Sequence, residues 1–105
     1  MKTDIFTINV FNLTTEEDVT PMYLAVNYYD FGTAQKVAEE YANELVDEDD
    51  VIEINVFAGE YEDENGNVWG DHDVIYTATN ANKEQSADIR QKEGYCTLEV
   101  DYYAK

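Results

Sequence analysis

Basic residues are scarce in this sequence, and a long central part has none. Six of the 105 residues are Lys or Arg, against 24 Asp and Glu, for a formal net charge of −18. Proteins that bind DNA or RNA take much of their affinity from Lys and Arg side chains that neutralise phosphates. The sequence therefore argues against direct nucleic-acid binding, and an anionic membrane surface would repel the chain in the same way.

Cysteine and long apolar runs are scarce as well. One cysteine, Cys96, excludes an internal disulfide and is typical of a reducing compartment. No apolar stretch approaches the roughly 20 residues that span a bilayer. Residues 1–4 lead into alternating residues rather than the apolar block of a signal peptide. We therefore predict a cytoplasmic protein that does not enter a membrane.

Aromatic residues, in contrast, are abundant. The chain has nine Tyr, four Phe and one Trp, and 44% of its residues are hydrophobic. Intrinsically disordered chains combine high net charge with few aromatic residues. We therefore expect one folded acidic domain over residues 1–105, a length at which a single core suffices.

Apolar periodicity predicts a mixture of strands and one helix. The alternation or β-branched runs typical of strands occur at residues 4–13, 22–29, 51–57, 74–79 and 95–103. In the second of these strands, Met22, Leu24, Val26 and Tyr28 would face the core together. In the last, the inward residues would be Cys96, Leu98, Val100 and Tyr102.

The helix is predicted over residues 33–46, with Asp30 or Thr33 as its N-cap. Its apolar face would consist of Ala34, Val37, Ala38, Tyr41 and Leu45, with Glu39, Glu40, Glu44 and Asp47 projecting to solvent. Residues 80–93 fit either a short helix or a long loop. The predicted fold is α+β: a mainly antiparallel sheet of about five strands, with one face covered by the helix, in the order β-β-α-β-β-(α or loop)-β.

The dipeptide Asn65-Gly66 is the clearest turn signal, because both residue types accept a positive φ. It predicts that residues 51–57 and 74–79 form a hairpin. A strict two-residue turn would place Glu60 opposite Asp71, and a like-charge pair is unfavourable. We therefore expect bulges at Gly59 and Gly70 that relieve this pairing.

Acidic residues are concentrated in the middle of the chain. The 46 residues from Val37 to Asn82 carry 14 carboxylates and no Lys or Arg, whereas residues 1–36 carry five acids. Residues 47–50 are all acidic and follow the predicted helix, where the negative end of the helix dipole makes each exposed acid cost about 0.3–1 kcal/mol. Glu40 and Glu44 add repulsion at i, i+4. This arrangement does not favour folding.

Two interpretations of the acid remain open. Surplus acid can serve solubility or reflect a halophilic source. Its clustering instead favours imitation of a polyanion. A globule of this length has a radius of gyration of about 13 Å, hence a diameter of roughly 33 Å, and duplex DNA of that length bears roughly 19 charges.

The leading hypothesis is an inhibitor or DNA mimic whose stripe of carboxylates occupies the nucleic-acid groove of a basic nucleic-acid-binding enzyme or regulator. In charge and size, with no shared motif, the chain is similar to phage or plasmid anti-restriction and anti-CRISPR proteins. Two aromatic residues would act as anchors near one end. The predicted partner-binding residues are Glu39, Glu40, Glu44, Asp47, Glu48, Asp49, Asp50, Glu60, Glu62, Asp63, Glu64, Asp71, Asp73, Tyr61 and Trp69.

The alternative hypothesis is a structural or adaptor subunit, for example a homodimer, that assembles through a Tyr-rich sheet face. Tyr28-Tyr29 and Tyr102-Tyr103 would each send one ring to each face of the sheet. The outward rings, with Tyr23 and Tyr95, would form an aromatic patch on the face away from the helix, or would be ordinary residues at the water boundary.

No catalytic, cofactor-binding or metal-binding residue is predicted. The segment Asp63-x-Asn65-Gly66 resembles part of a calcium loop, but Tyr61 and His72 would occupy loop positions 1 and 12, where carboxylates are required. His72 is expected at the surface and Cys96 in the core. We predict that the protein is not an enzyme.

Overall fold

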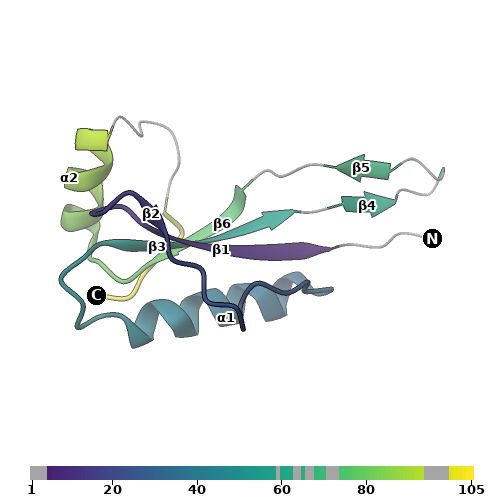
Figure 1. Cartoon of the computed structure of the whole chain (residues 1–105), viewed down its shortest axis with the longest axis horizontal. Coiled ribbons are helices and arrows are strands. Elements are labelled where there is room, and N and C mark those ends of the chain that lie inside the picture. Colours follow the sequence, from purple (N-terminus) through teal and green to yellow (C-terminus); the bar gives the residue numbers. More distant parts are fainter. Residues whose placement is uncertain (1–4, 59, 63–64, 66–67, 71–73, 94–99) are drawn as a thin grey trace.

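The computed structural model describes residues 5–58, 60–62, 65, 68–70, 74–93 and 100–105. This part of the chain is an α+β fold in which a five-stranded mixed sheet lies between two helices (Figure 1). The sheet has the order β2-β1-β3-β6-β7. Its strands are β1 (Phe6–Asn12), β2 (Glu17–Asp18), β3 (Ile52–Ala58), β6 (Val74–Thr79) and β7 (Tyr102–Tyr103). All neighbouring pairs are antiparallel except β6 and β7, which are parallel.

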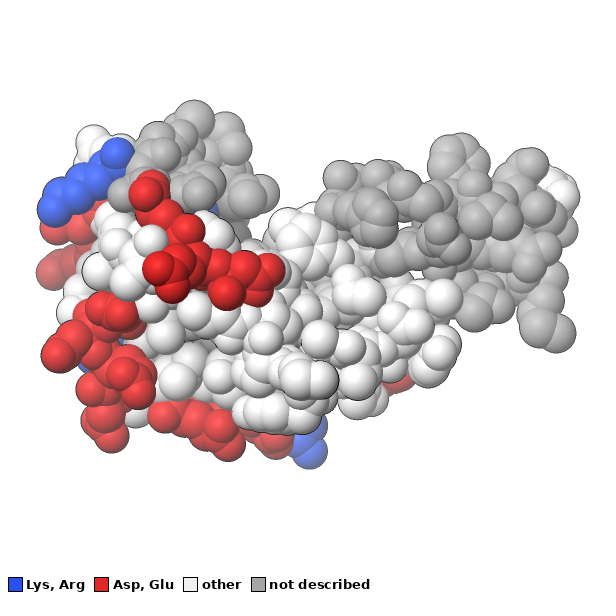
Figure 2. Space-filling view, viewed as in Figure 1, with Lys and Arg blue, Asp and Glu red and all other residues white. Residues whose placement is uncertain are grey.

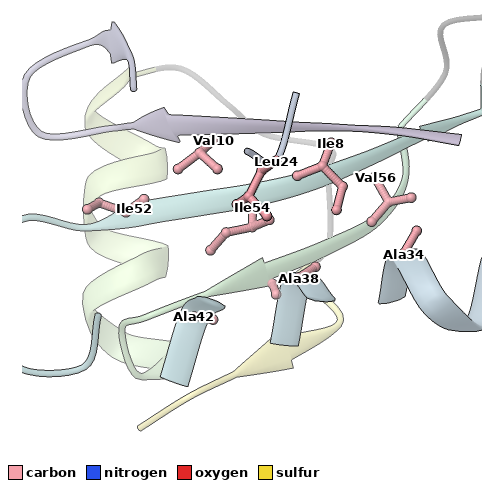
Figure 3. Close-up of a cluster of buried hydrophobic side chains, with 10 residues drawn as sticks. Ile8, Val10, Leu24, Ala34, Ala38, Ala42, Ile52, Ile54 and Val56 are labelled. Carbon is pink, nitrogen blue, oxygen red and sulfur yellow. The ribbon is translucent and has the colours of Figure 1, made fainter. Parts of the chain in front are cut away.

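The first helix, α1 (Phe31–Glu44), covers one face of the sheet, as the sequence predicts. Asp30 is its N-cap, with Oδ2 2.9 Å from the Thr33 backbone N. The buried side chains of α1 are Ala34, Ala38 and Ala42, whose small size brings the helix close to the sheet. They pack on alternate residues of the two central strands, including Ile8, Val10, Ile52, Ile54 and Val56 (Figure 3). This apolar layer is the core.

The second helix, α2 (Lys83–Glu93), settles the alternatives for residues 80–93 in favour of a helix. It lies on the other side of the sheet from α1 (Figure 1). Strand side chains alternate between faces, so Glu53, between the core residues Ile52 and Ile54, points away from α1. There its Oε2 accepts from Arg90 Nε and lies 2.6 Å from Arg90 Nη2. Both side chains are less than 10% exposed. Burial raises the pKa of Glu53, and the Arg90 charge opposes that rise.

The predicted strand over residues 22–29 is wrong. Residues 22–26 form turns, with the carbonyl of Pro21 accepting from the backbone N of Leu24 and Ala25 at 3.1 and 3.2 Å. The alternation does not translate into burial, since Leu24 is buried whereas Met22 and Val26 are exposed. On the edge of β1 away from β3, the pairing strand is instead β2, within the polar segment of residues 14–18, and Tyr28 forms an isolated bridge with Phe6.

Two further details of the predicted sheet need correction. The last strand, expected over residues 95–103, spans only Tyr102–Tyr103 in the described part of that stretch, and Cys96 and Leu98 lie outside the described residues. The hairpin of residues 51–57 and 74–79 is confirmed. It continues into a two-stranded sheet of β4 (Glu60–Glu62) and β5 (Val68–Gly70), in which Glu60 pairs with Gly70 rather than Asp71.

The register shift of the hairpin lies between Val56 and Phe57. It therefore precedes Gly59, which lies outside the described residues. A further change of one residue separates the pair Phe57–Val74 from the pair Glu60–Gly70, and Glu60 therefore does not align with Asp71. Among the described helices, neither is long and apolar enough to cross a membrane.

The buried ion pair supports a stability prediction. Replacing Arg90 with Met leaves the Glu53 carboxylate buried without its cation, and we expect a loss of about 3–5 kcal/mol in the free energy of unfolding. The double variant Glu53→Met/Arg90→Met should recover most of this loss, because no charge then remains buried. Urea unfolding measures both, with exposed Lys92→Met on the same helix as the control. Equal losses in R90M and K92M would contradict the role of the pair.

Candidate functional site

Exposed acids gather at one end of the molecule, where α1 ends and β3 begins. Figure 2 shows Asp and Glu mostly over this half of the face in view. We call this region the acidic end. Its members, all exposed, are Glu16, Glu17, Glu40, Glu44, Asp47, Glu48 and Asp49. All except Glu16 and Glu17 are among the partner-binding residues that the sequence predicts.

Backbone hydrogen bonds form the corner between α1 and β3, and no basic residue lies in the last turn of the helix. Leu45 is the C-cap of α1, and its backbone N donates to the Ala42 carbonyl at 3.1 Å. The Glu48 backbone N then donates to the Leu45 carbonyl at 3.0 Å. The last turn of α1 contains no Lys, Arg or His. The carbonyl end of the helix thus faces a run of acids, which is electrostatically unfavourable.

Asn80 holds this corner in place from inside. Its side chain is only 2% exposed. The amide nitrogen donates to the carbonyls of Leu45 and Asp50, each at 2.9 Å, and the amide oxygen accepts from the Ile52 backbone N at 2.8 Å. One buried side chain therefore satisfies three backbone groups of the loop, which fixes the path that leaves Asp47, Glu48 and Asp49 exposed.

The turn between β1 and β2 is attached to the same corner. Thr14 Oγ1 accepts from the Val51 backbone N at 2.9 Å, and Asn12 Nδ2 donates to Asp50 Oδ2 at 3.0 Å. Asn12 pairs with Ile52 on one side and with Glu17 on the other. Since neighbouring strands lie about 4.8 Å apart, the Glu17 backbone is about 10 Å from that of Ile52.

Glu16 and Glu17 are thus candidate residues that the sequence reasoning missed. The run Glu16-Glu17-Asp18 was visible as a polar turn, but its position beside the corner depends on the β1–β2 pairing. The Asp18 carboxylate is engaged in hydrogen bonds with a nearby residue, Thr20. It accepts from Thr20 Oγ1 at 2.6 Å and from the Thr20 backbone N at 2.9 Å, and these bonds lower its pKa.

Two predicted partner-binding acids are engaged within the fold. Glu39 was expected to project to solvent, but it is half-buried and accepts hydrogen bonds from Tyr76 Oη and from Gln35 Nε2. Asp50 is half-buried and binds Asn12. Helix periodicity could not locate Tyr76, since its ring reaches α1 from β6 across the sheet face.

The strands β4 and β5 lie at the other end of the molecule from the acidic end (Figure 1), along a longest dimension of 45 Å. Glu60 and Glu62 lie on β4, and Tyr61 pairs in register with Trp69 of β5. Four predicted residues lie outside the described residues, namely Asp63, Glu64, Asp71 and Asp73. No acid of α1 lies within its first eight residues, Phe31–Ala38. The structure therefore does not join the two acidic groups along α1.

Ion pairs offset little of the charge at the acidic end, although Lys83 and Lys92 of α2 are exposed at the same end of the molecule. Within the described residues two ion pairs form, and one of them, Arg90–Glu53, is buried beneath α2. The other joins Lys36 Nζ to Glu40 Oε1 at 4.0 Å on the exposed side of α1, where such pairs contribute about 0–1 kcal/mol. Lys105 lines the same shallow depression as Glu48 and Asp49 without forming an ion pair with either.

The described tyrosines do not form the expected patch on the sheet face away from α1. The Tyr23 ring instead lies 6.4 Å from the ring of Tyr41 on α1. Tyr102 also faces α1, with its Oη donating to Asn43 Oδ1 at 2.8 Å. Tyr29 is 68% exposed, and Tyr95 lies outside the described residues.

The described residues contain no group of three or more His, Cys, Asp or Glu side chains arranged to hold a metal ion. His72 and Cys96 lie outside the described part. Comparisons with protein-family models, with curated proteins and with solved structures found no match.

The contacts of Asn80 generate a stability prediction. Asn80→Ala removes the side-chain partner of the Asp50 carbonyl and of the Ile52 N–H, and leaves the Leu45 carbonyl with only the Glu48 N–H. We expect a loss of at least about 2 kcal/mol in the free energy of unfolding. Asn80→Asp should be no better, because it turns a carboxylate oxygen toward the carbonyls of Leu45 and Asp50. Chemical denaturation and hydrogen exchange of the Ile52 amide measure these effects. Exposed Asn27→Ala is the control, and an N80A loss no larger than that of N27A would contradict the role of Asn80.

The contact between Tyr76 and Glu39 predicts an alkaline pH dependence. Burial, and next the hydrogen bond to Glu39, raise the pKa of Tyr76 from 10.0 to about 12. The neutral phenol is thus favoured in the folded state, so its contribution is fully present below pH 10 and is lost as the pH rises toward 12. In Tyr76→Phe the free energy of unfolding should fall less over this window. Tyr29→Phe, at an exposed ring, should retain the wild-type slope, and identical slopes for Y76F and wild type would contradict the assignment.

Proposed function

We propose that this protein is a non-enzymatic, acidic protein-binding inhibitor that occupies the nucleic-acid groove of a basic enzyme or regulator. The observation that carries the proposal is the acidic end, where seven exposed carboxylates gather around a corner fixed from inside by Asn80. A groove lined by Lys and Arg is the surface that complements such a field.

The cost of these acids to the fold supports a role in binding. Asp47, Glu48 and Asp49 are exposed beyond the carbonyl end of α1, where each disfavours folding by about 0.3–1 kcal/mol at low salt. Solubility alone does not require this placement, because the same acids elsewhere on the surface would avoid the helix dipole.

The dimensions of the molecule set the scale of the mimicry. Duplex DNA as long as the 45 Å long axis bears roughly 26 charges, compared with the formal −18 of this chain. Acidic residues are also unevenly distributed along that axis, with one group at the acidic end and another on β4 at the opposite end. We propose that the acidic end makes the main contact and that β4 and β5 extend it only where the partner's groove reaches the other end.

The biological setting is part of the same proposal. A cytoplasmic inhibitor of the anti-restriction or anti-CRISPR type would meet a partner that binds duplex DNA and would compete with that DNA for the groove. The immobilised protein, mixed with lysate at low salt, should retain a basic nucleic-acid-binding protein. After purification of that partner, duplex DNA should displace it and added salt should weaken the complex steeply.

A pair of variants tests whether binding depends on the acidic end. Glu48→Gln/Asp49→Asn should weaken binding to the purified partner at least tenfold and raise the free energy of unfolding slightly, because two acids leave the helix C-terminus. Loss of binding in a more stable protein excludes unfolding as the cause. Titration calorimetry and urea unfolding measure the two effects.

The matched control is Glu60→Gln/Glu62→Gln, which removes the same charge from β4. Its effect on affinity should be smaller, because the two sites lie at opposite ends of the molecule and are separated by more than the Debye length of roughly 10 Å. Equal losses from the two pairs would indicate attraction by net charge alone and would contradict a defined acidic surface.

A further inference from the structure

We propose that the loop over residues 21–29 is an apolar anchor that inserts into a pocket of the partner protein, with the pocket bordered by Lys and Arg. This inference rests on the proposed function and specifies the partner surface. Four large apolar side chains of the loop are exposed: Met22 by 91%, Tyr23 by 67%, Val26 by 48% and Tyr29 by 68%. These four residues are called the apolar patch below.

The loop is fixed although its side chains are exposed. Leu24, between Tyr23 and Val26, is 5% exposed and belongs to the core. At the end of the loop, Tyr28 and Phe6 exchange backbone hydrogen bonds of 2.7 and 2.8 Å. The Pro21 carbonyl accepts two more at its start. A preorganised loop loses little conformational entropy when it binds, which favours affinity.

The composition of the apolar patch suits a protein contact. Tyr provides a large, rigid contact area and is enriched at binding hot spots. Met is flexible and fills irregular pockets. Two of the four residues that the sequence pattern predicts to face the core, Met22 and Val26, are exposed in the fold.

Acidic residues lie directly beside the apolar patch. The Tyr23 and Tyr41 rings meet edge to face, with centroids 6.4 Å apart at an interplanar angle of 72°. On α1, Glu44 is three residues after Tyr41 and thus its neighbour on the helix surface. Burial raises the pKa of Tyr41, and negative charge on Tyr23, Glu44 and Glu48 adds to that rise. Figure 2 shows an acid-free area on the face in view, with acids on two sides of it.

Charge complementarity selects the occupant of the apolar patch. A second copy of this chain would bring the carboxylates of Glu44 and Glu48 close to like charges, which is unfavourable. A partner with an apolar pocket bordered by Lys and Arg instead satisfies both parts of the surface. Exclusion of water by the apolar contact also strengthens the surrounding charge pairs, because it lowers the local dielectric.

The test uses two synthetic peptides with equal numbers of Lys and Arg, one interleaved with Leu and Trp and the other with Ser and Gln. Titration calorimetry at fixed salt compares four proteins: wild type, Met22→Gln/Tyr29→Gln, Glu48→Gln/Asp49→Asn, and Ile75→Thr. Ile75 is an exposed apolar residue of β6, 41% exposed, and serves as the matched control.

We expect wild type and I75T to bind the apolar basic peptide about tenfold or more tightly than the polar one. M22Q/Y29Q should bind the two peptides equally, with the wild-type affinity for the polar peptide. E48Q/D49N should bind both peptides more weakly than wild type. Equal affinities of wild type for the two peptides, or a difference that survives in M22Q/Y29Q, would overturn the anchor while leaving the proposed function intact.

Unchanged affinity of E48Q/D49N for both peptides would overturn the basic border and with it the proposed function. Sedimentation of the wild-type protein at the assay concentration tests the other candidate occupant of the apolar patch, a second copy of this chain, by measuring the oligomeric state. We expect a monomer, and a dimer that dissociates in M22Q/Y29Q would show that a second copy covers the apolar patch and would overturn the proposal.

Discussion

The buried amide of Asn80 is the interaction on which the acidic end depends. A corner between a helix and a strand leaves backbone carbonyls and N–H groups without regular partners, and burying them unpaired would cost about 1–3 kcal/mol each. Asn80 supplies both donors and an acceptor, bonding Leu45, Asp50 and Ile52. With the backbone satisfied from the inside, the neighbouring side chains are left to face solvent, and they are acids.

The two faces of the sheet divide the chemistry of the chain. The face under α1 is apolar and closely packed, because three alanines of α1 meet the branched residues of β1 and β3. The face under α2 holds the ion pair of Glu53 and Arg90. Because Arg90 is one of only six basic residues and is paired in the interior, its positive charge does not offset the negative charge of the exposed acids.

Sequence patterns predicted the parts of this fold in which periodicity and burial agree. The helix was predicted to within two residues, and Ile8 and Val10 lie in the core as the alternation over residues 4–13 indicates. The pattern failed at residues 22–29, where the same alternation occurs in a turn that is held at its start by Pro21, anchored in the core by Leu24 and bridged to β1 at Tyr28. Alternation reports where apolar side chains recur along the chain, but not whether a neighbouring strand is available to pair.

The sequence by itself determined the sign and amount of charge, the concentration of acids between residues 37 and 82, and the α+β class, because these follow from composition and local periodicity. Only the tertiary structure decided which acids are exposed together. Strand pairing brought Glu16 and Glu17 to the corner, Tyr76 and Asn12 engaged Glu39 and Asp50 within the fold, and the hairpin carried β4 to the opposite end. Apart from the local pairing of β1 with β2, these outcomes depend on contacts between residues more than ten positions apart along the chain, and local sequence patterns do not encode them.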